Sequence, residues 1–460
     1  MPKATLYHEA LRPQFHFTPR VNWTNDPNGL VYYKGEYHMF FQLNAKGINW
    51  GPNTRGHAVS RDLVHWKQID DAIKPDTYGW IWSGSAVVDW ENTAGLQKGR
   101  EKTLVAIYTT GGILGTAGCW EHPTTPAVQA IAYSNDRGRT WTKYKGNPVL
   151  GWRRGANRDP KVLWHAPTRT WIMALYMDEN DFALFGSKNL TQWDRLQDIH
   201  LCGSSECPDF FELPVDGKAK NTRWVFWGGD SKYLIGQFDG RTFTKEGGQL
   251  SLEQGPNGYA AQTWSDVPAE DGRRIQISWM RDGKYPAMPF NQQMTCPAEL
   301  TRKTFPEGIR LCREPVREIE TLRGRQHRWA GVTMKPGKNL VVPTKCDLFD
   351  VEVDVKLGDV SEFCLFIQGH ALRYNVAGRK FLFLNREVHT HSPAGLAGGR
   401  LQFRLLVDRT SVELFHAGGK TTASFCYLPA ARDWPLEFYL YDGSAKVVSL
   451  RVHELKSIWR

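Results

Sequence analysis

The sequence predicts an all-β protein in which a propeller is followed by a β-sandwich. Few windows keep apolar residues at the 3.6-residue period of a helix. Short alternating strands recur instead between Gly, Asn and Asp, for example at residues 103–109, 129–133 and 224–228. At 460 residues the chain is longer than one hydrophobic core usually allows, so we expect two domains.

A weak internal repeat predicts the propeller. Residues 60–66, 134–141 and 187–193 each read as a strand that ends in Ser, a turn that contains Asp or Asn, and a strand that opens with Trp. This spacing is typical of one four-stranded blade per unit. The copy that contains Asp136 resembles the hairpin of sialidase-type propellers. We interpret the Asp or Asn of each copy as a structural turn residue.

The pattern changes from about Asp347. Residues 350–357 alternate strictly between apolar and polar, as half-buried strands of a β-sandwich do. Residues 314–328 are charged and permit a helix, which is typical of a linker. We therefore predict a propeller domain at residues 1–313, a linker at 314–335 and a β-sandwich domain at 336–460.

Composition excludes several classes of protein. The net charge is +10, but Lys and Arg are scattered without a nucleic-acid-binding module, so we expect no nucleic-acid partner. The eight cysteines lack a Cys-x-x-Cys spacing, which argues against zinc ribbons and thioredoxin-type redox chemistry. No apolar run approaches the roughly 18 residues of a membrane span. Residues 1–19 lack the apolar core of a signal peptide, so we expect a cytoplasmic protein, or an extracellular or periplasmic one if a leader has been removed.

The most informative motif is Trp-Thr-Asn-Asp-Pro-Asn-Gly at residues 23–29. It sets the carboxylate of Asp26 among turn-forming residues, because Pro27 fixes φ and Gly29 accepts a positive φ. We expect a turn that points Asp26 into a cleft. Alone, this Asp would be read as a turn residue and nothing more.

Two further carboxylates lie at prolines far away in the sequence. Asp159 precedes Pro160, which predicts an extended backbone there, and Arg158 beside it can hold a carboxylate ionised. Glu206 stands before Cys207-Pro208. The three carboxylates come from three repeat units, and equivalent positions of successive blades converge on a propeller axis. Glycoside hydrolysis needs such a set, one carboxylate as nucleophile and one carboxylic acid as proton donor.

The chain resembles glycoside hydrolase family 32, the invertase, inulinase and levanase group. Residues 23–29, with Thr24 where Met is common, match its nucleophile motif, and residues 158–160 and 206–208 match its other two signatures in order. Further matches are Phe41-Gln42, Trp50, Trp82-Ser83-Gly84-Ser85, residues 259–263 and, in the tail, residues 407–415.

The resemblance implies a five-bladed propeller, a β-sandwich and a retaining mechanism. Asp26 would be the nucleophile, Glu206 the general acid/base and Asp159 the transition-state stabiliser. Because Glu206 must carry a proton, we expect its pKa to be raised by apolar surroundings or by the neighbouring carboxylates. Residues expected to bind substrate are Asn25, Gln42, Trp50, Trp82, Ser83 and Arg158.

The expected reaction is release of terminal β-D-fructofuranosyl residues from sucrose, inulin or levan, so the expected partner is a fructose-containing oligo- or polysaccharide. We expect no cofactor and no metal: His389 and His391 lack a third ligand nearby. Cys207 is expected to pack against Glu206 and to help desolvate it. The sequence leaves the oligomeric state and the preferred linkage open.

Three alternatives remain at this point. A fructosyltransferase shares the nucleophile and the acid, a non-catalytic binding protein keeps the propeller alone, and a family 43 type enzyme uses a similar fold with inverting chemistry. Two departures from the family pattern also leave leaving-group preference open. Arg281-Asp282 stands where Asn-Trp is expected, and residues 290–298 differ from the usual run.

Overall fold

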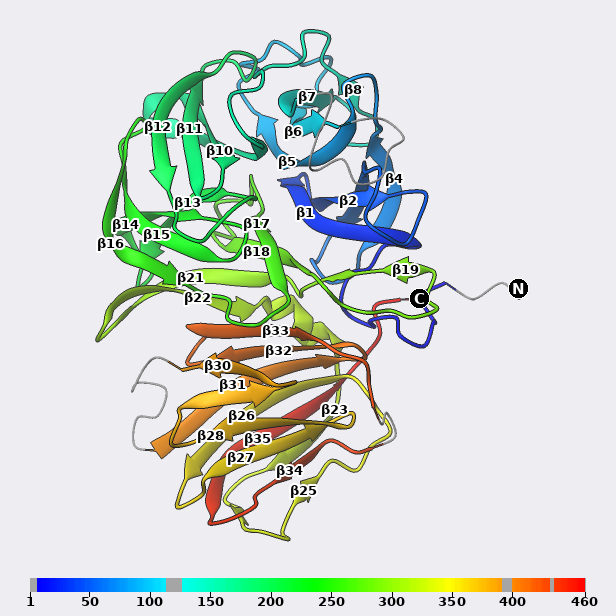
Figure 1. Ribbon diagram of the computed structural model, residues 1–460, viewed down its shortest axis with the longest axis vertical. Helices are drawn as coiled ribbons and strands as arrows, with labels where there is room; N and C mark the ends of the chain where they lie inside the picture. Colours follow the sequence, from blue (N-terminus) through cyan, green and yellow to red (C-terminus); the bar gives the residue numbers. More distant parts are fainter. Residues whose placement is uncertain (1–5, 113–125, 391–398, 431–433, 460) are drawn as a thin grey trace.

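The computed structural model describes residues 6–112, 126–390, 399–430 and 434–459. Strands make up almost all of its regular structure, and the helices in these ranges are two short 3-10 turns, η1 (Ala166–Thr168) and η2 (Arg317–Leu322). A ring of blades, blue to green in Figure 1, stands on a two-layered sandwich, yellow to red. The prediction of an all-β propeller followed by a β-sandwich is confirmed.

Each of the first four blades is an antiparallel meander of four consecutive strands. The first holds β1 (Asn22–Tyr33), β2 (Glu36–Asn44), β3 (Thr54–Ser60) and β4 (Lys67–Ile73), and the second β5 (Trp80–Asp89), β6 (Thr103–Gly111), β7 (Val128–Ser134) and β8 (Thr142–Lys143). The third holds β9 (Arg158–His165), β10 (Thr170–Asp178), β11 (Asp181–Ser187) and β12 (Asp194–His200), and the fourth β13 (Asp209–Val215), β14 (Lys218–Trp227), β15 (Lys232–Phe238) and β16 (Phe243–Ser251).

The fifth blade closes the ring. It holds β17 (Gly258–Thr263), β18 (Arg274–Met280), β21 (Ala298–Phe305) and β22 (Gly308–Pro315), with the short β20 (Gln293–Met294) beside β18. Between β18 and β20 the chain returns to the first blade, where β19 (Phe290–Asn291) pairs in parallel with the start of β1. This pairing joins the last blade to the first.

The predicted repeat is the turn between the third and fourth strands of a blade. In the first blade Asp62 Oδ1 accepts hydrogen bonds from the backbone N–H groups of Val64 and His65 at 3.0 and 2.8 Å. The indole N–H of Trp66 closes the turn by donating to Leu63 O at 2.9 Å. Asp136 and Asn189 do the same in the next two blades. Their structural role is thus confirmed, and an unpredicted fourth copy lies at Asp239, where neither Ser nor Trp marks it.

The C-terminal part is a sandwich of two sheets that pack around one hydrophobic core. One sheet has the order β23 (Arg323–Trp329), β35 (Ala445–Leu455), β26 (Phe349–Leu357), β31 (Arg400–Asp408), β32 (Ser411–His416) and β33 (Thr421–Cys426), with β24 (Thr333–Met334) beside β35. The other has the order β25 (Leu340–Val341), β34 (Glu437–Tyr439), β27 (Glu362–Ile367), β28 (His370–Asn375), β29 (Lys380–Phe383) and β30 (Arg386–His389). The alternation predicted at residues 350–357 is that of β26, whose Val351, Val353 and Val355 are buried.

The segment predicted as a linker contains regular structure. Its first residues end β22, η2 follows, and β23 and β24 then pair with β35 of the sandwich. We propose that the boundary between the two domains lies at η2.

The two domains also meet through the chain that precedes the first blade. The imidazole of His16 is buried between two sandwich carboxylates, with Nδ1 2.8 Å from Asp408 and Nε2 2.9 Å from Glu413. Asp408 in addition accepts the backbone N–H groups of Gln14 and Phe15. The segment before β1 is therefore bonded to the sandwich as well as to its own blade, where Arg20 N donates to Gln68 Oε1 at 2.7 Å.

Candidate active site

The innermost strands of the blades are irregular where they begin. The ladders of β1, β5 and β17 shift register at residues 24–27, 81–84 and 259–262, and that between β9 and β10 shifts beside Arg158. A bulge leaves residues unpaired and re-aims their side chains. Here it turns side chains out of the sheets, and residues from all five blades line a single pocket at this end of the ring.

Asp26 lies inside β1, not in the turn that the sequence predicted. Two register shifts accommodate Pro27 and Gly29, and Gly29 takes the positive φ of 58° that was expected of it. The turn-forming residues therefore make a bulged strand, because the flanking residues still pair with β2. The result for the side chain is as expected, since Asp26 points into the pocket.

Hydrogen-bond donors surround the Asp26 carboxylate. Oδ2 accepts from Ser83 Oγ at 2.7 Å and from Gln42 Nε2 at 3.0 Å, while Oδ1 accepts from Asn25 Nδ2 at 3.2 Å. Gln42 is itself oriented by Asn53, which donates to its Oε1 at 2.7 Å. Burial raises the pKa of Asp26, and these donors counteract part of that rise.

Asp159 departs from the expected extended conformation, since its φ is +64°. Its backbone N–H donates to Thr109 Oγ1 at 2.8 Å, which helps hold this left-handed backbone in place. Such a conformation costs on the order of 1–3 kcal/mol in a residue other than Gly and is often found at active sites. Burial raises the pKa of Asp159 to about 7, although the neighbouring Arg158 favours the ionised form.

Glu206 corrects one prediction. We expected its pKa to be raised, and burial does act in that direction, yet the pKa is lowered overall. The guanidinium of Arg158 binds Oε1, and the hydroxyl of Tyr259 donates to Oε2 at 2.5 Å. These two charge-assisted bonds stabilise the carboxylate more than the apolar surroundings destabilise it.

Cys207 lies between the two aspartates rather than against Glu206. Its Sγ is 3.5 Å from Oδ2 of Asp26 and 3.5 Å from Oδ2 of Asp159, and its backbone N–H donates to Asp159 at 3.1 Å. Burial raises the pKa of this thiol well above its usual range, and the carboxylates add to the effect. The thiol is therefore uncharged, separates the two aspartate carboxyl groups and is a weak hydrogen-bond donor to both.

The pocket has a volume of about 170 Å³. Every residue that the sequence predicted for the site lines this pocket except Ser83. Ser83 lies behind Asp26 and donates a hydrogen bond to its carboxylate. Two aromatic lining residues, Tyr259 and Trp279, were not predicted as site residues. The match of residues 259–263 to the family pattern was the signal that could have identified Tyr259. The full lining is Asn25, Asp26, Gln42, Trp50, Trp82, Arg158, Asp159, Glu206, Tyr259 and Trp279.

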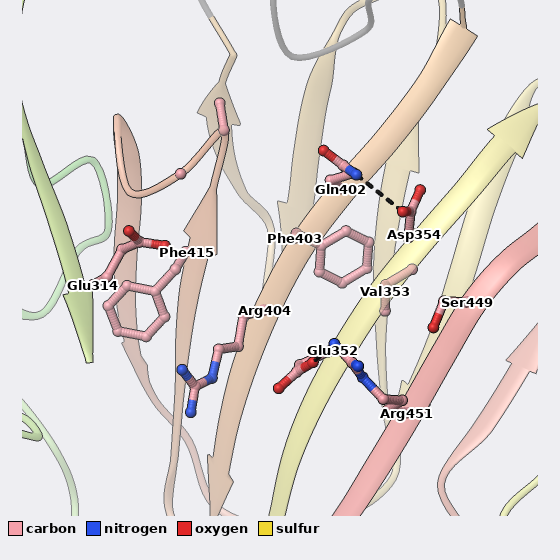
Figure 2. Close-up of a pocket in the computed structure, with 12 residues that line it drawn as sticks. Glu314, Glu352, Val353, Asp354, Gln402, Phe403, Arg404, Phe415, Ser449 and Arg451 are labelled. Atoms are coloured by element: carbon pink, nitrogen blue, oxygen red, sulfur yellow. Dashed lines mark hydrogen bonds and ion pairs between the residues drawn. The ribbon is translucent and has the colours of Figure 1, made fainter. Parts of the chain in front are cut away.

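A second hollow, of about 250 Å³, lies on the sandwich near the end of β22 and is shown in Figure 2. Phe403 and Phe415 lie among its lining residues, but its acids are already paired. Glu352 binds Arg451, and Asp354 accepts a bond of 2.9 Å from Gln402, the dashed line in the figure. Arg451 and Arg400 pair with these two carboxylates separately, whereas Asp26, Asp159 and Glu206 meet in the propeller pocket, which is therefore the better candidate for acid–base chemistry.

Two further expectations can be placed. The Nε2 atom of His389 lies 3.3 Å from Oε2 of Glu387 on the surface, and His391 lies outside the described residues. No helix in the described ranges is long and apolar enough to cross a bilayer.

Both halves of the chain match known sequence families. The Glycosyl hydrolases family 32 N-terminal domain matches residues 16–315, and the family 32 C-terminal domain matches residues 318–454. A levanase of Bacillus subtilis is 39% identical over 99% of this chain and 72% of its own length. A levanase of Bacillus sp. strain L7 is 33% identical over 100% of this chain, which spans 54% of that protein. An extracellular exo-inulinase of Aspergillus niger is 30% identical over 98% of this chain and 96% of its own length.

Solved structures agree. The exo-inulinase of Aspergillus awamori superposes with a TM-score of 0.87 at 26% identity, over 98% of this chain and 100% of that one. A fructofuranosidase variant of Schwanniomyces occidentalis complexed with fructosylnystose also gives 0.87 at 26% identity, over 99% and 100% of the two chains. With both domains matched in order along nearly the whole sequence, the chain belongs to glycoside hydrolase family 32.

Proposed function

We propose that this protein is a retaining, exo-acting β-fructofuranosidase. It would remove terminal non-reducing β-D-fructofuranosyl residues from sucrose, inulin or levan. The observation that carries the proposal is the meeting of Asp26, Asp159 and Glu206 in one pocket of about 170 Å³, which suits one terminal sugar residue rather than the middle of a chain. The levanases and exo-inulinases among its relatives support the substrate class.

Asp26 is assigned as the nucleophile. Its Oδ2 carries the stronger donors, Ser83 and Gln42, whereas Oδ1 has only the longer bond from Asn25. Oδ1 therefore retains a lone pair for attack on the anomeric carbon of the fructosyl unit. The fixed donors keep the carboxylate oriented and ionised in a buried site, as attack requires.

Glu206 is assigned as the general acid/base. In the free site it is a carboxylate held by Arg158 and Tyr259, so it has to gain a proton before it can act as an acid. A sugar hydroxyl that binds Arg158 would weaken this ion pair and raise the pKa of Glu206. The carboxylic acid then protonates the departing glycosidic oxygen, and the resulting carboxylate later accepts a proton from the attacking water.

Asp159 and Arg158 are assigned to the fructosyl hydroxyls. Asp159 accepts from the backbone N–H and the thiol of Cys207 through Oδ2. Its carboxyl can bond sugar hydroxyls, and these bonds strengthen as positive charge develops on the ring. Trp50, Trp82 and Trp279 supply flat apolar surface against which a furanose ring can pack.

The first test is product release from sucrose, inulin and levan by the parent, Asp26→Ala and Glu206→Ala. We expect free fructose from at least one substrate, with the loss on Asp26→Ala of about 10⁴-fold or more. Longer or cyclic products without free fructose would instead indicate a fructosyltransferase. No product from any of the three, or activity that survives Asp26→Ala, would reject the proposal.

Azide distinguishes the two roles. In a retaining enzyme without its nucleophile, azide attacks the fructosyl carbon directly and gives an inverted fructosyl azide. Without the acid/base, azide intercepts the covalent intermediate and gives a retained product. We expect the inverted azide from Asp26→Ala and the retained azide from Glu206→Ala, with an activated β-fructosyl fluoride as substrate. Exchanged stereochemistry would mean that the roles are reversed.

The place of action is also proposed. The relative from Aspergillus niger is named extracellular, so we infer that this enzyme acts outside the cytoplasm. Fractionation of the native host, with activity assayed in the medium, the periplasm and the cytosol, tests this. Activity confined to the cytosol would contradict it.

A further inference from the structure

The acid/base candidate is held from the fifth blade as well as from the third. The hydroxyl of Tyr259, near the start of β17, donates to Glu206 Oε2 at 2.5 Å. The backbone of Glu206 is also linked to that of Ala260, the residue after Tyr259, through Gly229, whose N–H donates to Glu206 O at 3.0 Å and whose carbonyl accepts from Ala260 N at 2.7 Å. The position of the Glu206 carboxyl therefore depends on where β17 begins.

Tyr259 is in turn held by its neighbours on the fifth blade. The guanidinium of Arg281 lies 4.3 Å from the centre of the Tyr259 ring, a cation–π arrangement. Arg281 is fixed by Asn257 through two bonds, from Arg281 N to Asn257 O at 2.8 Å and from Asn257 Nδ2 to Arg281 O at 2.7 Å. Arg281 stands where the family pattern has Asn, so the cation–π contact with Tyr259 is a feature of this chain that the family pattern does not predict.

Asn257 is bonded to the sandwich. Its Oδ1 accepts the backbone N–H of Cys426 at 2.8 Å, and its own N–H donates to Ser424 O at 3.3 Å. Both partners lie on β33, the edge strand of the sandwich sheet that faces the propeller (Figure 1). Residues 253–257 thus run along β33 immediately before β17.

A buried ion pair fixes the beginning of this segment. Glu253 Oε1 accepts the backbone N–H of Ser424 at 2.7 Å, and Oε2 binds the guanidinium of Arg313. Glu253 also bridges Thr422 in parallel, and Gln254 N donates to Thr422 O at 2.9 Å. Both charged side chains of the pair are almost fully buried, so the segment is anchored at each end.

We propose that the β-sandwich positions the acid/base carboxyl of the propeller, through a relay from β33 to Asn257, from Asn257 to Arg281 and Tyr259, and from Tyr259 to Glu206. Asn257, Tyr259 and Arg281 are positioning residues in this scheme. The inference rests on the proposed role of Glu206. It gives the C-terminal domain a part in the reaction without contact with the substrate.

The charged and titratable groups around Glu206 set its pKa, so the effect of the relay can be measured as a change in that pKa. Arg158 and Asp159 come from β9, Asp26 from β1, Tyr259 from β17, and Arg281 from the loop after β18; all act on its charge. Removal of the relay takes away one hydrogen bond and one cation, and leaves Arg158 and both aspartates. The carboxylate form of Glu206 then becomes less favoured, and its pKa rises.

The experiment compares Asn257→Ala, Arg281→Met and Tyr259→Phe with the parent, using the full chain. We expect the alkaline limb of kcat/KM on sucrose to move up by about half to one pH unit in each variant. On sucrose kcat should fall by about 10-fold, because the hydrogen bond from Tyr259 to Glu206 is lost in Tyr259→Phe and loses its fixed orientation in the other two variants. With β-fructosyl fluoride, whose leaving group needs no proton, the fall should be less than about 2-fold, since the nucleophile is untouched.

Lys420→Met is the matched control. Lys420 also joins the sandwich to the propeller, but its partners Glu307 and Phe305 belong to the β21–β22 hairpin rather than to the segment before β17. We expect this variant to lose stability alone, with the pH profile of the parent on both substrates. If Asn257→Ala is recovered unfolded, Arg281→Met decides the question, because it keeps every backbone bond of the segment.

The relay is overturned if the three variants keep the parent's alkaline limb, or lose as much activity on the fluoride as on sucrose. Failure of the proposed function would look different. In that case the parent releases no fructose, or Glu206→Ala keeps its activity on sucrose, and the comparison among the relay variants no longer bears on Glu206.

Discussion

At the scale of single residues, the environment of a side chain fixes its chemistry more than its identity does. Cys207 stands next to the acid/base candidate in sequence, where a reactive thiol would compete with it. Its sulfur is buried and lies 3.5 Å from each of two carboxylates, which raises its pKa and keeps it protonated. A protonated, enclosed thiol is a poor nucleophile.

We therefore expect Cys207 to resist alkylation in the folded protein. Iodoacetamide at pH 8 should label Cys202, which is exposed, while Cys207 stays unlabelled and activity is retained. After unfolding in guanidinium, Cys207 should react. Peptide mass mapping before and after unfolding measures both. Rapid labelling of Cys207 in the native state, with loss of activity, would show that the thiol is accessible and ionisable.

Two buried histidines predict acid sensitivity. His38 Nδ1 lies 3.0 Å from His57 Nε2, and burial lowers the pKa of His38 to about 4 and that of His57 well below its usual value. Since the unfolded chain binds these protons near pH 6.5, stability falls as the pH drops from 6.5 towards 4. A shift of this size in His38 alone costs about 3 kcal/mol at pH 4.

His38→Gln should therefore lose less stability between pH 7 and pH 4.5 than the parent does. The exposed His8, changed to Gln, is the control and should follow the parent. Urea unfolding at a series of pH values measures the difference. Parallel curves for the parent and His38→Gln would indicate that the pair takes up protons in the folded state.

At the scale of the strand, the bulges at the starts of β1, β5, β9 and β17 are what convert a regular blade into part of a site. The bulge in β1 depends on Gly29, which has a φ of +58° and lies against the first blade's own core. A methyl group there would come within 2.3 Å of Arg55 Nη2 and 2.7 Å of the Phe40 ring. The backbone conformation that directs Asp26 into the pocket therefore requires a residue without a side chain at position 29.

Gly29→Ala is expected to displace Asp26 and lower kcat by at least about 100-fold, because a shift of about 1 Å at a catalytic group has that effect. Gly35→Ala is the matched control: Gly35 also has a positive φ, +86°, but has nothing within 4 Å of the added methyl. It should cost about 1 kcal/mol of stability and leave kcat unchanged. Equal activity of the two variants would mean that the bulge tolerates a side chain.

Local sequence predicted the carboxylates because proline and glycine at bulges are visible as motifs. Asp26 and Asp159 stand directly before a proline, and Glu206 stands two residues before one. Their surroundings were not predictable in the same way. The pKa of Glu206 depends on Arg158 and Tyr259, which come from other blades, and Tyr259 owes its position to contacts with the sandwich. The left-handed φ of Asp159 likewise depends on a bond from a neighbouring blade.

At the scale of the whole molecule, His16 couples the two domains. Burial by itself would lower its pKa, but the Cys296 sulfur and the carboxylates of Asp408 and Glu413 raise it well above the usual value. The folded protein therefore holds an imidazolium between two acids. The stability that this provides is fully present below pH 6.5 and is lost as the pH rises through the folded pKa.

His16→Gln should destabilise the protein by about 3–5 kcal/mol at pH 6, because it leaves two buried carboxylates without their cation. The deficit should shrink as the pH rises through the raised pKa of His16, because the parent then loses its own proton. Urea unfolding at a series of pH values from 6 upwards measures the change. A deficit that stays constant would contradict a charged His16.

The meeting of the two ends of the described chain bears on synthesis. The indole of Trp459 stacks on Tyr7 at 4.2 Å and donates to Pro13 O at 2.7 Å, and Ile458 N donates to Gln14 O at 2.8 Å. Residues 7–14 therefore cannot complete these contacts until residues 458–459, far later in the chain, have been made. Early blades can pair their strands during translation, but the contacts between residues 7–14 and residues 458–459 form only after both domains have been made, so they belong to the last steps of folding.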